Sequence, residues 1–238
     1  MQSPKVAARV AGVAYLVCVV TGLFAEVAVR GSVIVSGDAA ATARNILASE
    51  GLYRLGFAAD LVGSVAYLVV TLLLYQLLKP VSAGLSLLAA FFSIVGIAIG
   101  GAASLGHLAP LLILKPLPYL SVFDPAQLQS LAYLALKLHA QGYLVALVFF
   151  GCYEVVLGYL IFKSTFFPRT LGVLVCIAGV AFLTNSFAIF VAPQIGDALN
   201  NLMLALDGVG EISLTLWLLV IGLDAERWLA KAYPAKAS

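Results

Sequence analysis

The sequence contains very little charge. Lysine, arginine, aspartate and glutamate make up 10% of the 238 residues, whereas 63% of the residues are hydrophobic. Soluble domains carry about 25% charged residues, so this chain lacks the polar side chains to cover a surface that faces water. The net charge is only +2 and no basic run is present, which excludes nucleic acid as an expected partner. The composition predicts a protein that is solvated by the lipid bilayer.

Signatures of known chemistry are also missing. The three cysteines lie inside apolar stretches without metal-ligand spacing. With only two histidines in the chain, a three-histidine zinc site is excluded. A site built from His107, His139 and carboxylates would suit zinc or manganese, but the spacing shows no ligand signature. Nucleophile elbows and nucleotide-binding loops are absent as well. We therefore predict no metal site, and catalytic residues and cofactors stay unknown.

What the sequence does contain is long apolar stretches. A membrane-spanning helix needs about 20 apolar residues, and only helices pair their backbone groups within the segment. We therefore predict an all-α polytopic membrane bundle of about six helices that forms a single domain over residues 1–238. Two short amphipathic helices, Ala39–Ser49 and Pro125–Lys137, are expected at the membrane surface. The six predicted spans are residues 10–29, 52–78, 84–114, 139–162, 170–191 and 199–223.

Basic residues are distributed unequally between the two sides of this topology. The side of the N-terminus holds eight of them and the opposite side holds five. The positive-inside rule then predicts that both termini lie in the cytoplasm of a cell membrane and that both surface helices lie outside. The eight are Lys5, Arg9, Lys79, Lys163, Arg169, Arg227, Lys231 and Lys236. The five are Arg30, Arg44, Arg54, Lys115 and Lys137.

Ionisable side chains interrupt the apolar spans. Such a residue at the bilayer centre costs at least ~2.5–3.5 kcal/mol, so it usually faces the bundle interior and is a candidate for function. Most of these residues fall in the outer half of the predicted spans, and Glu211 lies nearer the middle. This distribution predicts a polar cavity that opens to the outer face. The ligand-binding candidates for this cavity are Glu26, Arg54, Asp60, His107, His139, Asp207 and Glu211.

Asp207 and Glu211 are four residues apart, so both point to one side of a helix. Two negative charges in that position repel each other. A cation, a bound metal ion or the protonation of one carboxylate would relieve the repulsion.

Arg54 and Asp60 lie about 120° apart around their helix. Arg54 is therefore expected to reach Glu26 or Glu211 on a neighbouring helix. Asp60 then needs another partner, for which the two histidines are the candidates. We expect Arg54, Asp60 and Glu211 to converge on one pocket.

Three stretches of the chain resemble a known family. They are LASEGLYRLGFAADL (residues 47–61), LHAQGYLVALVFFGCYEVVLGYLIFKSTFFPRTLGVL (138–174) and GEISLTLWLLVIG (210–222). They are similar to the bacterial membrane-protein family catalogued as domain of unknown function 4386. The resemblance implies a six-span bundle and carries no reaction, cofactor or catalytic residue. It adds weight to Arg54, Asp60, His139 and Glu211, whereas the family pattern has an aspartate where Asn185 stands and a histidine near Glu154.

Three functions fit these observations. The first is a membrane protein whose outward polar cavity binds or transports a small molecule or ion. The second is a membrane-embedded enzyme that acts on a lipid or another amphiphile. The third is a structural or regulatory subunit whose polar residues only hold helices together. The sequence does not indicate the oligomeric state.

Overall fold

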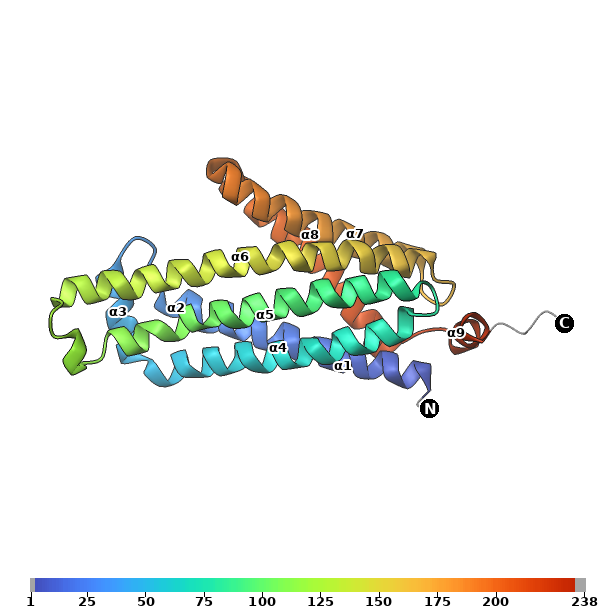
Figure 1. Ribbon diagram of the computed structural model, residues 1–238, viewed down its shortest axis with the longest axis horizontal. Coiled ribbons are helices and arrows are strands. Elements are labelled where there is room, and N and C mark those ends of the chain that lie inside the picture. Colours follow the sequence, from blue (N-terminus) through green and yellow to red (C-terminus); the bar gives the residue numbers. More distant parts are fainter. Residues whose placement is uncertain (1–2, 234–238) are drawn as a thin grey trace. The chain divides into compact units, whose positions relative to one another are not determined.

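A computed structural model describes residues 3–233 of the chain (Figure 1). Among these residues there are helices and no strands. Six helical segments are long and apolar enough to cross a membrane, so the predicted all-α, multi-pass fold is confirmed. The first segment comprises α1 (Pro4–Leu23), the π-helical η1 (Phe24–Arg30) and α2 (Gly31–Val33). The other five are α4 (Glu50–Leu78), α5 (Ala83–Ile113), α6 (Pro125–Lys163), α7 (Arg169–Val191) and α8 (Pro193–Val220).

The shorter elements differ in part from the prediction. The helix expected at Ala39–Ser49 is present as α3 (Ala39–Ala48). The Asp38 side chain caps it by accepting a hydrogen bond of 2.8 Å from the backbone N–H of Ala41. The second expected surface helix is not separate, because Pro125–Lys137 forms the first turns of the 39-residue α6. No proline follows Pro125 within α6, so nothing breaks the helix there. A 3₁₀ turn, η2 (Pro118–Leu120), precedes α6 and a short helix, α9 (Ala225–Ala232), follows α8.

The sixth span begins and ends earlier than the predicted residues 199–223. Pro193 occupies the first turn of α8, where its fixed backbone and missing N–H are tolerated. At the other end, Gly222 adopts a positive φ of 76° and its N–H donates to the carbonyl oxygen of Trp217 at 2.8 Å. This left-handed glycine cap ends the helix.

Contacts within the chain define two compact units. The first unit comprises Met1–Leu16, Ala66–Ile97 and Val145–Ser238, of which residues 3–16, 66–97 and 145–233 are described. The second unit comprises Val17–Val65 and Ala98–Leu144. The second unit has an apolar core into which α3 inserts one side chain, that of Ile46. The core consists of Val29, Val33, Ile46, Tyr53, Leu111 and Leu136.

In the first unit, glycines bring α6 and α7 into backbone contact. A Cβ atom on Gly158 would lie 2.6 Å from the carbonyl oxygen of Gly172, and one on Gly179 would lie 2.7 Å from that of Gly151. Small residues allow such close approach in lipid, where dispersion forces hold helices together. The two contacts flank Glu154 on α6, so they fix the backbone that carries this carboxylate.

The next pair of helices, α7 and α8, run side by side (Figure 1). A Cβ atom on Gly210 of α8 would lie 2.5 Å from the Cβ atom of Ala178 on α7. Gly210 directly precedes Glu211, so a second carboxylate also lies at a tight helix contact.

Candidate functional site

The polar side chains of the spans gather in two clusters, one in each unit. The first, here the Arg30 cluster, belongs to the second unit. It consists of Glu26, Arg30, Tyr53, Asp60, His107 and His139. The second, here the carboxylate cluster, belongs to the first unit. It consists of Glu154, Asp207 and Glu211.

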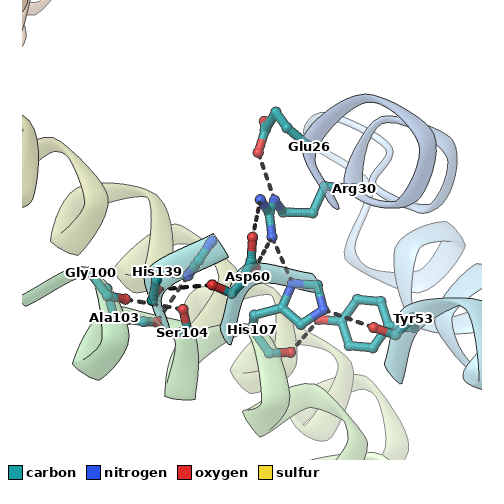
Figure 2. A network of polar contacts seen from close by, with 10 residues as sticks. Glu26, Arg30, Tyr53, Asp60, Gly100, Ala103, Ser104, His107 and His139 are labelled. Carbon is teal, nitrogen blue, oxygen red and sulfur yellow. Dashed lines mark hydrogen bonds and ion pairs between the residues drawn. The ribbon is translucent and has the colours of Figure 1, made fainter. Parts of the chain in front are cut away.

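The guanidinium of Arg30 lies between two carboxylates (Figure 2). Its Nη1 is 2.6 Å from Asp60 Oδ2, and its Nη2 is 3.3 Å from Asp60 Oδ1. Its Nε donates to Glu26 Oε2 at 2.6 Å. The Arg30 and Asp60 side chains are only 11% and 15% exposed, whereas that of Glu26 is 70% exposed. The two-pronged contact therefore balances a largely buried charge.

Local structure sets this arrangement. Glu26 and Arg30 both lie on the π-helical turn η1, four residues apart, and their side chains meet. Such π-helical turns are rare and often occur at functional positions. Gly56 of α4 packs against Val29, since a Cβ there would lie 2.8 Å from Val29 Cγ1. This close approach lets Asp60, one turn further along α4, reach Arg30.

His107 completes the network, and its tautomer follows from its neighbours. Arg30 Nη1 can only donate, so His107 Nδ1 at 3.3 Å accepts. The ring proton is then on Nε2, which donates to the carbonyl oxygen of Tyr53 at 3.1 Å. The Tyr53 hydroxyl donates in return to the carbonyl oxygen of His107. The two rings stack with centroids 4.1 Å apart, so this reciprocal contact joins α4 to α5.

His139 contacts the same network edge-on. Its ring centroid lies 5.8 Å from that of His107, and its Nδ1 donates to the carbonyl oxygen of Ala103 at 2.9 Å. The expectation that Asp60 pairs with a histidine is therefore wrong. Asp60 binds Arg30, and both histidines bind backbone carbonyl oxygens.

The predicted role of Arg54 is also corrected. Its Nη2 lies 2.6 Å from Glu50 Oε1, one turn back on α4, and Lys115 Nζ reaches the same oxygen at 3.1 Å. The Arg54 side chain is 51% exposed. Glu50 lies four residues from Arg54 on the same helix, so the two side chains are neighbours. Arg54 therefore pairs with Glu50 and not with Glu26 or Glu211, which lie on other helices. The arginine that binds Asp60 is instead Arg30, which was counted above only among the five basic residues of the outer side.

The carboxylate cluster joins α6 to α8. Glu154, Asp207 and Glu211 each offer an oxygen atom, and these atoms all lie within 4.8 Å of one another. Glu154 is 2% exposed and Asp207 is 9% exposed. Asp207 and Glu211 share one side of α8, as their spacing predicted. Glu154 was not among the predicted site residues, because no spacing signal links two helices so far apart in sequence.

Within the described part of the chain, the three carboxylates have few hydrogen-bond donors and no basic side chain to offset a negative charge. Glu154 Oε2 and Asp207 Oδ1 are buried without a hydrogen-bond partner. Glu211 Oε1 accepts one hydrogen bond of 3.1 Å, from the Tyr15 hydroxyl. No basic side chain in residues 3–233 forms an ion pair with any of the three. At an effective dielectric constant of about 20, two full charges no more than 4.8 Å apart repel by about 3.5 kcal/mol or more. Protons or a cation must offset this repulsion.

The unsatisfied polar atoms are concentrated in the same helices. In the described part of the chain, every buried side-chain N or O atom without a partner lies on α6, α7 or α8. On α8 the polar residues Asp207, Glu211 and Thr215 recur every four residues and form one polar stripe. Asn200 extends the stripe towards the start of α8, where its Oδ1 accepts from Asn185 Nδ2 at 3.0 Å.

The site residues predicted from the sequence are therefore divided between the two clusters. Glu26, Asp60, His107 and His139 belong to the Arg30 cluster, in which the charged groups, both ring nitrogens of His107 and Nδ1 of His139 have partners. Asp207 and Glu211 belong to the carboxylate cluster, which retains oxygen atoms able to accept a proton or a cation. Chemically, the carboxylate cluster is the stronger candidate for a functional site.

The six apolar helices define the chain as a multi-pass α-helical membrane protein. A sequence model of the family described as "Domain of unknown function (DUF4386)" matches residues 10–222. The chain belongs to this family, as the three quoted stretches indicated. No curated protein and no solved structure shows significant similarity to the chain.

Proposed function

We propose that this protein binds a small cation inside the membrane and carries it across. The observation that supports the proposal is the carboxylate cluster, in which Glu154, Asp207 and Glu211 place oxygen atoms within 4.8 Å of one another and have no basic partner among the described residues. Ionisable residues inside spans usually mark ion pathways or proton relays when they lack a structural partner. This is the ion-binding form of the function expected from the sequence.

The polar stripe of α8 supports transport in addition to binding. From Asn200 to Thr215 it covers 15 residue steps, which correspond to about 22 Å of helix. The hydrocarbon core is about 30 Å thick. A row of partly unsatisfied oxygen atoms over most of that thickness offers successive contacts to a moving cation or proton.

The distribution of basic residues supports a cytoplasmic location for both termini. In that orientation the Arg30 cluster lies in the outer half of the spans. Reporter fusions test the orientation: a fusion after Ala40 should report the outer side and a fusion at the C-terminus the cytoplasm. A C-terminal fusion that reports the outer side would reverse the topology.

Reconstituted protein on a solid-supported membrane tests the transport function. Concentration jumps of H⁺, Na⁺, K⁺, Mg²⁺, Ca²⁺ and Mn²⁺ are applied, and the transient current is recorded. We expect at least one of these cations to give a current that Glu154→Gln and Glu211→Gln abolish. The matched control is Glu226→Gln on α9, an exposed carboxylate outside the spans, which should leave the current unchanged. Wild-type protein that passes no current with any of the six would refute the proposal.

A membrane-embedded enzyme that acts on a lipid is the second candidate. An apolar cavity of about 500 Å³ lies among α6, α7 and α8, lined in part by Met203 and Leu206, which precede Asp207. Such a cavity accommodates an acyl chain close to the carboxylates that would act as acid and base. Mass spectrometry of lipids incubated with the protein distinguishes this candidate, because conversion that depends on Glu154 would favour the enzyme.

A further inference from the structure

We infer that the carboxylate cluster binds a divalent metal ion that prefers oxygen ligands: Mg²⁺, Mn²⁺ or Ca²⁺. The inference rests on the proposed cation function and names the class of cation. Three features of Glu154, Asp207 and Glu211 support it: the spacing of their oxygen atoms, their charge, and the type of ligand they provide.

The spacing fits the coordination shell of a metal ion. Oxygen atoms on opposite sides of Ca²⁺ lie about 4.6–5.2 Å apart, and those on opposite sides of Mg²⁺ about 4.0–4.2 Å apart. The ligand atoms of the three residues all lie within 4.8 Å of one another. This limit falls in the range for Ca²⁺, so the three fit around a Ca²⁺ ion as they stand, whereas a smaller ion such as Mg²⁺ requires them to be no more than about 4.2 Å apart. Two of the oxygen atoms, Glu154 Oε2 and Asp207 Oδ1, are buried and have no hydrogen-bond partner that coordination would displace.

The charge of the cluster favours a divalent ion over a monovalent one. Three ionised carboxylates carry three negative charges, and a monovalent cation would leave two of them uncompensated in a buried site. A divalent cation leaves one, which a single proton or the neighbouring hydroxyl groups can offset. Tyr15 already donates to Glu211 Oε1 at 3.1 Å, and outer-shell contacts of this kind orient ligating carboxylates.

The ligand type indicates which divalent ions are preferred. Carboxylate oxygens suit Mg²⁺, Ca²⁺ and Mn²⁺, whereas imidazole and thiolate suit zinc and copper. Both histidines of the chain belong to the Arg30 cluster. Cys176 Sγ is directed to the carbonyl oxygen of Val155 at 3.4 Å. The ligand set is therefore made only of oxygen atoms.

The backbone contacts around the cluster hold the ligands in place. A Cβ atom on Gly179 would lie 2.9 Å from Glu154 Cβ, so the Glu154 side chain leaves α6 directly against α7. Gly210, next to Glu211, is in contact with Ala178 of α7. Both carboxylates thus project from rigid helices, as a preorganised metal site requires.

Electron paramagnetic resonance of Mn²⁺ tests the inference. Purified full-length protein in detergent, stripped of metals, is titrated with Mn²⁺, and the six-line signal of free Mn²⁺ reports how much is bound. We expect about one bound Mn²⁺ per chain, which Mg²⁺ or Ca²⁺ displaces. Glu154→Gln, Asp207→Asn and Glu211→Gln should each weaken binding about tenfold or more, since even outer-shell changes cost that much. Glu154→Asp, which keeps the charge, should weaken it less, and Glu226→Gln should leave it unchanged.

The outcomes separate the metal inference from the proposed transport function. The inference is overturned if the wild-type protein binds no Mn²⁺, a result that does not depend on how the variants fold. It is also overturned if the three neutral variants bind Mn²⁺ as well as the wild type does. If in that case H⁺ or Na⁺ jumps still produce currents that depend on Glu211, the transport function stands with a monovalent cation. If Mn²⁺ binds as expected and no current is found with any cation, the metal site stands and transport fails.

Discussion

The pair between Arg30 and Asp60 permits a quantitative prediction of stability. Asp60→Ala removes the two-pronged partner of a guanidinium whose side chain is 11% exposed. Breaking a buried ion pair from one side costs about 3–5 kcal/mol, because the remaining charge is uncompensated. Glu26 still contacts Arg30, but its side chain is 70% exposed, so it offsets only part of the loss. We expect Asp60→Ala to lower the free energy of unfolding by about 3 kcal/mol.

A second substitution tests whether the uncompensated charge of Arg30 causes this loss of stability. Arg30→Met in the Asp60→Ala background removes the orphaned charge and keeps an apolar side chain of similar length. Replacement of a whole buried pair by apolar residues is often close to neutral. The double variant should therefore recover most of the lost stability.

The assay is reversible unfolding in mixed micelles with an increasing mole fraction of dodecyl sulfate. Tryptophan fluorescence follows the transition, since Trp228 Nε1 donates to the carbonyl oxygen of Leu77 at 2.8 Å in the folded protein. The matched control is Arg54→Ala, which breaks an exposed pair with Glu50 and should cost less than about 1 kcal/mol. Equal losses for Asp60→Ala and Arg54→Ala would show that the Arg30 cluster is hydrated and would refute the reasoning.

Three further results are expected in the same unfolding assay. Tyr53→Phe removes the hydroxyl that donates to the His107 carbonyl oxygen and should cost about 1 kcal/mol, the net contribution of one intramolecular hydrogen bond; no loss would mean that water replaces the bond. Gly158→Ala places a Cβ 2.6 Å from backbone and should destabilise strongly, whereas Gly84→Ala, with open space around it, should not. Glu211→Gln, measured with a metal chelator present and at a pH high enough to ionise the carboxylates, should raise the free energy of unfolding, since it removes one repelling charge; a decrease would contradict the account of the carboxylate cluster.

The fold could be predicted from the sequence because a bilayer imposes length and hydropathy on each span. The residues predicted for the second, third and fifth spans agree with α4, α5 and α7 to within two residues at each end. The error at Pro125–Lys137 has a local cause. Amphipathic character suggested a separate surface helix, but no helix-breaking residue separates that segment from the span that follows.

The candidate site could be predicted only where partners lie close in sequence. The four-residue spacing placed Asp207 and Glu211 on one side of a helix. The same spacing joins Arg30 to Glu26 and Arg54 to Glu50, and applying it there would have corrected the arginine assignment. Contacts between helices distant in sequence follow from how the helices pack and not from spacing along one of them.

The two clusters differ in what they imply about function. In the Arg30 cluster, Asp60 and Glu26 balance the arginine, so the three charges satisfy one another and leave no free charge to assign to a ligand. The carboxylate cluster has no such explanation, because an apolar side chain at Glu154 would relieve repulsion and remove one buried oxygen atom that has no partner, Glu154 Oε2. A buried group that lowers stability and is not compensated by another side chain is expected where activity requires it. Function is therefore best sought at Glu154, Asp207 and Glu211. Two of their oxygen atoms, Glu154 Oε2 and Asp207 Oδ1, are buried without a partner, and stability does not account for them.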